Sequence, residues 1–163
     1  MNYLTNKYEL SKYLIERYYE QYGDIIHKYV LQGALYLLYG NYAMYRNIDQ
    51  KNKDRIEEYG PFPKELFKPN FMMKGFGPVD RDLFYDYRSG ISATGMPINF
   101  KDIMYVENDF LEHVVTSLAD EAISLSSTVL YSAISQDADG NLNYKENELI
   151  ESNVIKEIYR NKL

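Results

Sequence analysis

The sequence predicts a mainly α-helical domain, α+β at most, with a short strand or hairpin element around residues 71–79 and 102–106. Apolar residues recur at helical spacing along most of the chain, whereas strand signals are confined to brief aromatic or β-branched stretches. With 163 residues, 45% of them hydrophobic, the chain is long enough for one core. No repeat or linker interrupts it. We therefore expect a single domain over residues 1–163.

Two helices are expected in the first part of the chain. Residues 6–21 place Tyr and Leu side chains at helical spacing, and Gly23 ends that helix. Asp24 is positioned to cap the next helix. Residues 25–44 carry apolar side chains on nearly every face, which is typical of a helix surrounded by the core.

The middle of the chain is less regular. Residues 45–70 are polar and contain three prolines, so they predict a surface excursion with a short amphipathic piece at residues 54–59. Residues 71–79 favour an extended segment that turns at Gly-Pro. Asp80 then caps a helix over residues 81–88.

The last part predicts further helices separated by turns. Residues 102–106 favour a brief strand or a turn, and residues 136–143 a sharp polar turn. Helices are expected at residues 110–119, at residues 122–135, and from a cap at Ser152 or Asn153 through Tyr159.

Composition excludes several classes of function. There is no cysteine, which rules out disulfides and thiolate metal sites. The 24 acidic residues exceed the 18 basic ones, which argues against direct binding of a nucleic-acid backbone. The chain has neither a membrane-length apolar run nor the apolar core of a signal peptide, so we expect a cytoplasmic protein without membrane contact.

No catalytic motif emerges from the sequence. His27 and His113 lack a clear carboxylate partner and are expected to be packing residues. The serines lie outside any G-x-S-x-G turn, and the glycine-containing segments lack the spacing and the lysine of a phosphate-binding loop. We expect neither enzymatic activity nor a bound cofactor.

One segment resembles a calcium-binding loop. Aligned with the twelve-residue EF-hand loop, residues 135–146 place carboxylates and a glycine at several of the required positions, although Ser135 replaces the first carboxylate. The candidate ligands are Asp137, Asp139, Asn141 and Glu146. The alternative is a polar turn in which the Asp and Asn side chains satisfy local backbone groups.

Three sequence blocks stand out in order along the chain. The first is an apolar helix over residues 28–40, KYVLQGALYLLYG, with Gln32 inside it. The second is an aromatic-Gly-Pro-Val block, Phe76, Gly77, Pro78 and Val79, followed by a helical tyrosine, Tyr85 or Tyr87. The third is a C-terminal run from Ile150 that includes Ile155, Lys156, Glu157 and Tyr159.

Together these blocks resemble the SocA-like, or Panacea, antitoxin domain of bacteria and phages, over about residues 8–160. The resemblance implies neutralisation of a protein toxin by direct binding, and some members act as adaptors to a protease. We expect aromatic and acidic side chains of the excursion to contact the partner, or else to hold the excursion down. These are Tyr42, Tyr45, Glu57, Glu58, Phe62 and Phe67.

Other functions remain open at this point. An acidic phage protein could inhibit a host defence nuclease, such as a CRISPR nuclease, by occupying its nucleic-acid channel. A weak calcium-binding module is a third hypothesis, and an enzyme ranks last. The 18 tyrosines favour a protein-binding function, because the tyrosine ring suits half-buried helix faces and interfaces.

Overall fold

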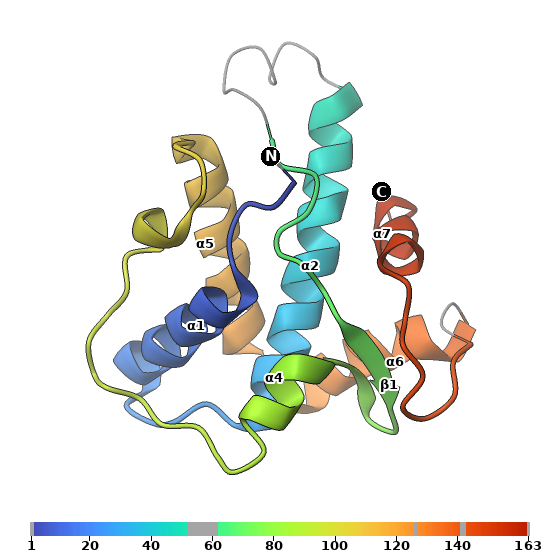
Figure 1. Ribbon diagram of the computed structural model, residues 1–163, viewed down its shortest axis with the longest axis horizontal. Helices are drawn as coiled ribbons and strands as arrows, with labels where there is room; N and C mark the ends of the chain where they lie inside the picture. The colour runs from blue at the N-terminus through green and yellow to red at the C-terminus, as the bar shows by residue number, and fades with distance from the viewer. Residues whose placement is uncertain (1, 52–61, 126, 141–142, 163) are drawn as a thin grey trace.

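The computed structural model describes residues 2–51, 62–125, 127–140 and 143–162, without the side chains of residues 47–51 and 138–140. The fold is mainly helical with one small hairpin, which confirms the predicted fold class (Figure 1). The elements are α1 (Lys7–Tyr22), α2 (Lys28–Lys51), β1 (Phe71–Lys74), β2 (Gly77–Asp80), α4 (Arg81–Asp86), a 3-10 helix η1 (Phe100–Ile103), α5 (Asp109–Ser124), α6 (Ser127–Gly140) and α7 (Ser152–Arg160). None of the described helices is both long enough and apolar enough to cross a membrane.

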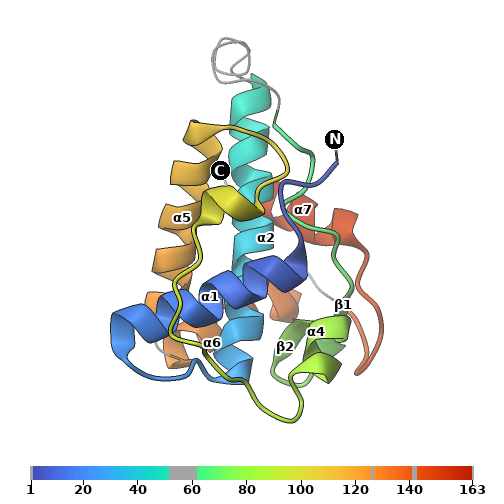
Figure 2. The same cartoon turned by 60° about the vertical axis from the view of Figure 1, so that its left-hand side comes forward.

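Helix α2 is the axis of the molecule. Helices α1, α5, α6 and α7 and strand β2 all pack against it, and the two views show it surrounded along most of its length (Figures 1 and 2). Residues 31–40 are all buried. A helix enclosed by neighbours has no polar face to present to water, which explains why its sequence is apolar all round.

Short polar side chains start the surrounding helices. The Asn6 side chain accepts hydrogen bonds from the backbone N–H of Tyr8 (2.7 Å) and Glu9 at the start of α1. Asp80 caps α4 and Asn108 caps α5 in the same way. Gly23 ends α1 in the left-handed conformation (φ 68°), as the sequence predicts.

The hairpin is covered on its outer edge by a distant segment. Strands β1 and β2 pair antiparallel, with Phe71 opposite Asp80 and Lys74 opposite Gly77. On the other side of β1, the Met73 N–H donates to the carbonyl of Glu148 (2.9 Å), and the Ile150 N–H donates to the carbonyl of Phe71 (2.8 Å). Both edges of β1 therefore have hydrogen-bond partners.

Three local predictions were wrong. His27 directly precedes α2 and its Nδ1 accepts from the Tyr29 N–H, whereas the Asp24 side chain accepts from the adjacent Ile25 N–H. Helix α7 begins one residue early, after Glu151, without a side-chain cap. The turn expected at residues 136–143 is instead helical as far as Gly140, because Asp137 faces inward and is held by tertiary contacts.

At residues 102–106 the turn alternative is correct and the strand alternative is wrong. The Asn99 side chain accepts from the Lys101 N–H (3.1 Å) and caps the 3-10 helix η1. A bend follows, in which the Tyr105 N–H donates to the carbonyl of Leu4 (2.8 Å). This capped turn brings the segment against the N-terminal stretch.

The C-terminal helix α7 closes the core over α2. Its Ile155 and Tyr159 side chains are buried, and the ring of Tyr159 lies edge-to-face with Tyr36, with 5.8 Å between centroids. Gly40 of α2 makes room for this ring, since a Cβ added there would lie 2.5 Å from it. The absence of a side chain at Gly40 therefore allows α7 to approach α2 closely.

We predict that Gly40→Ala destabilises the fold by about 1 to 2 kcal/mol, because displacement of the Tyr159 ring outweighs the gain in helix propensity. Chemical denaturation measures the change. Gly75→Ala is the matched control: its added Cβ would have its nearest neighbour at 3.8 Å, so a change within about 0.5 kcal/mol is expected. Equal stability of the two variants would contradict the packing role of Gly40.

Candidate functional site

The structure brings the first sequence block into contact with both of the others, since Tyr159 packs against Gly40 and Gln32 contacts the hairpin. Gln32 of α2 points at the end of the hairpin, where its Oε1 accepts from the Asp80 N–H (2.8 Å) and its Nε2 lies 3.5 Å from the Asp80 carbonyl oxygen. The amide therefore binds the backbone that directly follows Gly77, Pro78 and Val79. This contact fixes the hairpin relative to the central helix.

Asp80 is a buried charge with a complete set of partners. Its carboxylate accepts from Lys7 Nζ (3.1 Å), from the Asn70 N–H (3.0 Å) and from the Leu83 N–H (3.2 Å). Lys7 also pairs with Asp82 at 2.6 Å. Buried charges are stable in a fold when they are paired and hydrogen-bonded in this way.

The pKa values of Lys7 and Asp82 shift in opposite directions. Burial lowers the pKa of Lys7, but its hydrogen bond to Asp82 and the charge of Asp80 outweigh burial, so the net pKa is raised above 10.5. The hydrogen bond from Lys7 is the main cause that lowers the pKa of Asp82 below 3.8. Both shifts favour the charged forms of Lys7 and Asp82. The resulting ion pair ties α1, which carries Lys7, to α4, which carries Asp82.

The remaining residues of the sequence blocks do not form one site. Tyr87 is half-buried, and burial raises its pKa. In the C-terminal block Ile155 is in the core, Lys156 pairs with Glu65 at 3.3 Å, and Glu157 is exposed. This block attaches α7 to the rest of the molecule and lies on α2 away from Gln32's contact with the hairpin.

The aromatic side chains expected to contact a partner are largely core residues. Tyr42 is 1% exposed and donates its hydroxyl hydrogen to the carbonyl of Pro63 (2.6 Å). Phe62 and Phe67 are buried, and Tyr45 is half-buried. These residues hold the excursion against α2, which is the alternative that the sequence left open. Glu57 and Glu58 lie outside the described residues.

The predicted calcium loop does not form over its first half. Asp137 lies within α6, is 2% exposed, and accepts from the Tyr36 hydroxyl (2.9 Å) and from Lys162 Nζ (2.7 Å). Glu146 is an exposed residue near Lys74. The side chain of Asp139 and all of Asn141 lie outside the described residues. Within the described part of the chain, no three potential ligands cluster for a metal ion.

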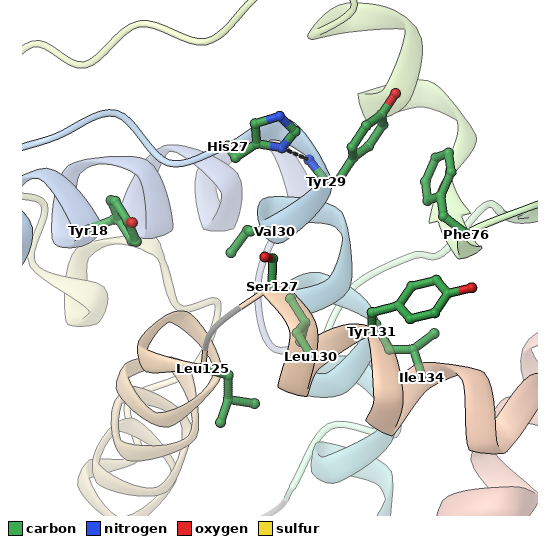
Figure 3. Close-up of a pocket in the computed structure, with 10 residues that line it drawn as sticks. All are labelled: Tyr18, His27, Tyr29, Val30, Phe76, Leu125, Ser127, Leu130, Tyr131 and Ile134. Carbon is green, nitrogen blue, oxygen red and sulfur yellow. Dashed lines mark hydrogen bonds between the residues drawn. The ribbon is translucent and has the colours of Figure 1, made fainter.

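An open aromatic groove lies between the start of α2, the tip of the hairpin and α6 (Figure 3). Its volume is about 580 Å³, which is within the range of ligand-binding clefts. The lining residues, which together we call the aromatic groove, are Tyr18, His27, Tyr29, Val30, Phe76, Leu125, Ser127, Leu130, Tyr131 and Ile134.

The rims of the aromatic groove are exposed rings. Tyr29 packs against Phe76 with 4.4 Å between ring centroids, and Tyr131 stands on the α6 side. Tyr29 is 44% exposed and Tyr131 is 51% exposed. Both histidines, which were expected to be packing residues, are exposed, and His27 lies at this groove. Large apolar rings at the surface of a cleft are typical of a binding site.

The α6 wall of the groove carries no charge. Residues 122–136 contain no Asp, Glu, Lys, Arg or His, although 26% of the whole chain is charged. Several of them are nonetheless at the surface, among them Ser127, Val129 and Tyr131. This charge-free stretch is the sequence feature that could have indicated the groove. It does so only when the stretch is known to be exposed, which the sequence does not show.

Comparison with known proteins finds no matching family model, curated protein or solved structure. The chemistry of the site follows from its own residues. They offer an apolar cleft with aromatic rims, and next to it a buried ion pair that fixes one wall.

We predict that Lys7→Met destabilises the protein by about 3 to 5 kcal/mol, because it leaves the Asp80 carboxylate buried without its cation. Lys12→Met is the control, since Lys12 lies on the same helix with a side chain that is 61% exposed and pairs with Glu9 at 3.8 Å. It should change stability by less than about 1 kcal/mol. Similar losses in both variants would rule out a special role for the buried pair.

The stability difference between wild type and Lys7→Met should also depend on pH. The Asp82 contribution is present above 3.8 and is lost as pH falls through its lowered folded pKa. The Lys7 contribution is present below 10.5 and is lost as pH rises through its raised folded pKa. Denaturation across pH should show a plateau between these limits, and a difference that persists unchanged at both extremes would contradict the assignment.

Proposed function

We propose that this protein is an antitoxin-like domain that binds a toxin or effector protein directly and neutralises it without catalysis. The observation that carries the proposal is the aromatic groove with its exposed Tyr29 and Tyr131 rims. Tyrosine and phenylalanine are enriched in the centres of protein interfaces, and charged residues are depleted there. The groove has both properties.

The groove is held in shape before any partner arrives. Phe76 sits at the tip of a hairpin that Gln32 and the Asp80–Lys7 pair fix to α2 and α1. Tyr29 packs on Phe76, so its ring is partly ordered already. Because a preformed site loses little conformational entropy on binding, a few aromatic anchors can supply most of the affinity.

The resemblance to the Panacea domain supports the same function. The residues that carry it include Phe76, which lines the groove, and Gln32, which fixes the hairpin that bears Phe76. The uncharged α6 wall favours a toxin over the alternative of a nuclease channel, because mimicry of nucleic acid needs closely spaced carboxylates. We place this function in the cytoplasm.

The test is an affinity capture from the native host with wild type, Tyr131→Ala and Tyr105→Ala. Tyr105 is the matched control, because it is also 51% exposed but lines a different cavity with Tyr8 and Lys68. We expect one partner, identified by mass spectrometry, that Tyr131→Ala binds at least about tenfold more weakly in a titration with the purified proteins. Tyr105→Ala should bind like the wild type.

Co-expression then tests neutralisation. The captured partner, expressed alone, should arrest growth, and wild-type protein should restore growth while Tyr131→Ala restores it poorly. A partner that binds both variants equally would exclude the groove as the contact surface. A partner that does not affect growth, alone or together with this protein, would argue against the antitoxin function.

A further inference from the structure

A second cavity lies at the start of α1 and shares no lining residue with the aromatic groove. Its walls come from the N-terminal stretch, the segment before β1, helix α4 and the bend after η1. We call it the tyrosine cavity, because Tyr3, Tyr8 and Tyr105 are among its lining residues. Its volume of about 590 Å³ falls in the range of clefts that hold small organic molecules.

The three rings of the tyrosine cavity are carried on backbone that is already fixed. The N–H of Leu4, next to Tyr3, donates to the carbonyl of Glu65 (3.0 Å). The carbonyl of Leu4 accepts from the Tyr105 N–H (2.8 Å), which holds the second ring beside the first segment. Tyr8 lies in the capped first turn of α1. Because the walls are ordered before a ligand arrives, little conformational entropy is lost on binding.

The buried charges of this cavity already have partners. Lys7, whose side chain is 9% exposed, pairs with Asp80 (3.0 Å) and with Asp82 (2.6 Å). The Asp82 carboxylate accepts from Lys7 through Oδ2 and from the Asn70 amide through Oδ1 (3.2 Å). A cationic ligand would therefore have to compete with two existing donors for the Asp82 oxygens.

Lys68 supplies a positive charge that the fold does not use. It is exposed, it lines the cavity, and it forms no ion pair or hydrogen bond with the part of the chain that the structure describes. The available charge at this site is thus positive, although the protein as a whole carries −6. An ammonium group at the edge of a partly enclosed cavity attracts anions.

We propose that the tyrosine cavity binds a small aromatic anion, meaning a planar ring that carries a carboxylate or a phosphate group. The ring stacks on the exposed faces of Tyr8 and Tyr105, which are 42% and 51% accessible. The anionic group pairs with Lys68, since a charge-assisted hydrogen bond to an ammonium group suits either anion. This ligand site is separate from the surface assigned to the protein partner.

Two rival ligands fit the cavity less well. Rings of tyrosines also bind organic cations, but here Lys68 would repel a cation and the Asp82 oxygens have donors. A bare inorganic anion would pair with Lys68 and leave the three rings without a contact. The combination of aromatic walls with an available ammonium group therefore favours a ligand with both a ring and a negative charge.

Fluorescence titration with indole probes tests the charge preference. The protein contains no tryptophan, so selectively excited indole emission reports on the probe alone. Indole-3-acetate and tryptamine share one ring and carry opposite charges. We expect indole-3-acetate to bind at least about tenfold more tightly than tryptamine, because Lys68 attracts the first and repels the second.

Competition against bound indole-3-acetate distinguishes the two anionic groups. Benzoate represents a ring with a carboxylate, and adenosine monophosphate a ring with a phosphate. The more effective competitor identifies the group that the cavity prefers. Adenosine and inorganic phosphate, which each lack one half of the ligand, should both compete at least about tenfold more weakly than adenosine monophosphate.

Two pairs of variants locate the site. Lys68→Met should weaken indole-3-acetate at least about fivefold, whereas Lys64→Met, equally exposed on the same segment but outside the cavity, should stay within about twofold of wild type. Tyr105→Ala should weaken it at least about tenfold through lost stacking. Tyr131→Ala, equally exposed at the aromatic groove, should bind like the wild type. Near-UV circular dichroism verifies that each variant is folded.

Several results would overturn the proposal. Tryptamine binding as tightly as indole-3-acetate would exclude an anion site, and equal losses in the two lysine variants would exclude Lys68 as its partner. So would the absence of saturable binding for every probe up to about 10 mM. A protein that captures its partner through Tyr131 but binds no aromatic anion would lose this proposal and keep the proposed function, and the opposite result would do the reverse.

Discussion

The position of the hairpin depends on one buried carboxylate. Asp80 is completely inaccessible to solvent, and it joins the end of β2 to α1 through Lys7 and to the start of α4 through its own cap. Gln32 binds the Asp80 backbone from the central helix. A buried charge tolerates few alternative arrangements, since each loses a partner that water cannot replace. The hairpin tip and Phe76 are therefore fixed relative to α2, and so is one wall of the groove.

The opposite wall is fixed by close backbone approach. A Cβ added to Gly33 of α2 would lie 2.7 Å from Leu130, and one added to Gly77 of β2 would lie 2.7 Å from Ile134. Helix α6 therefore packs almost against the backbone of both elements. Because Leu130 and Ile134 face inward, Tyr131 is left on the flank of the helix, at the mouth of the groove.

Much of the fold could be predicted from the sequence because it follows from local patterns. The central helix is apolar on all faces, and the Gly-Pro pair with the following Asp80 marks both the hairpin and the cap of α4.

Asp137 shows where local patterns are no longer sufficient to predict the structure. Its segment has turn-forming composition, but contacts with Tyr36 and Lys162 draw it into a helix. The groove could not be predicted, since its walls are far apart in sequence and Tyr42 and Tyr131 look alike until their burial is known.

The hairpin has a further property that follows from the order of the chain. The outer edge of β1 is covered by Glu148 and Ile150, which are synthesised long after the strand itself. While the protein emerges from the ribosome, that edge carries free N–H and C=O groups. Beside them lie apolar side chains that are buried in the folded protein, such as Phe71 and Met73. Such an edge is a template for pairing with other chains. Synthesis of residues 147–150 is thus the step that ends the exposure of this edge to aggregation, and any chain that stops before residue 147 leaves the edge open.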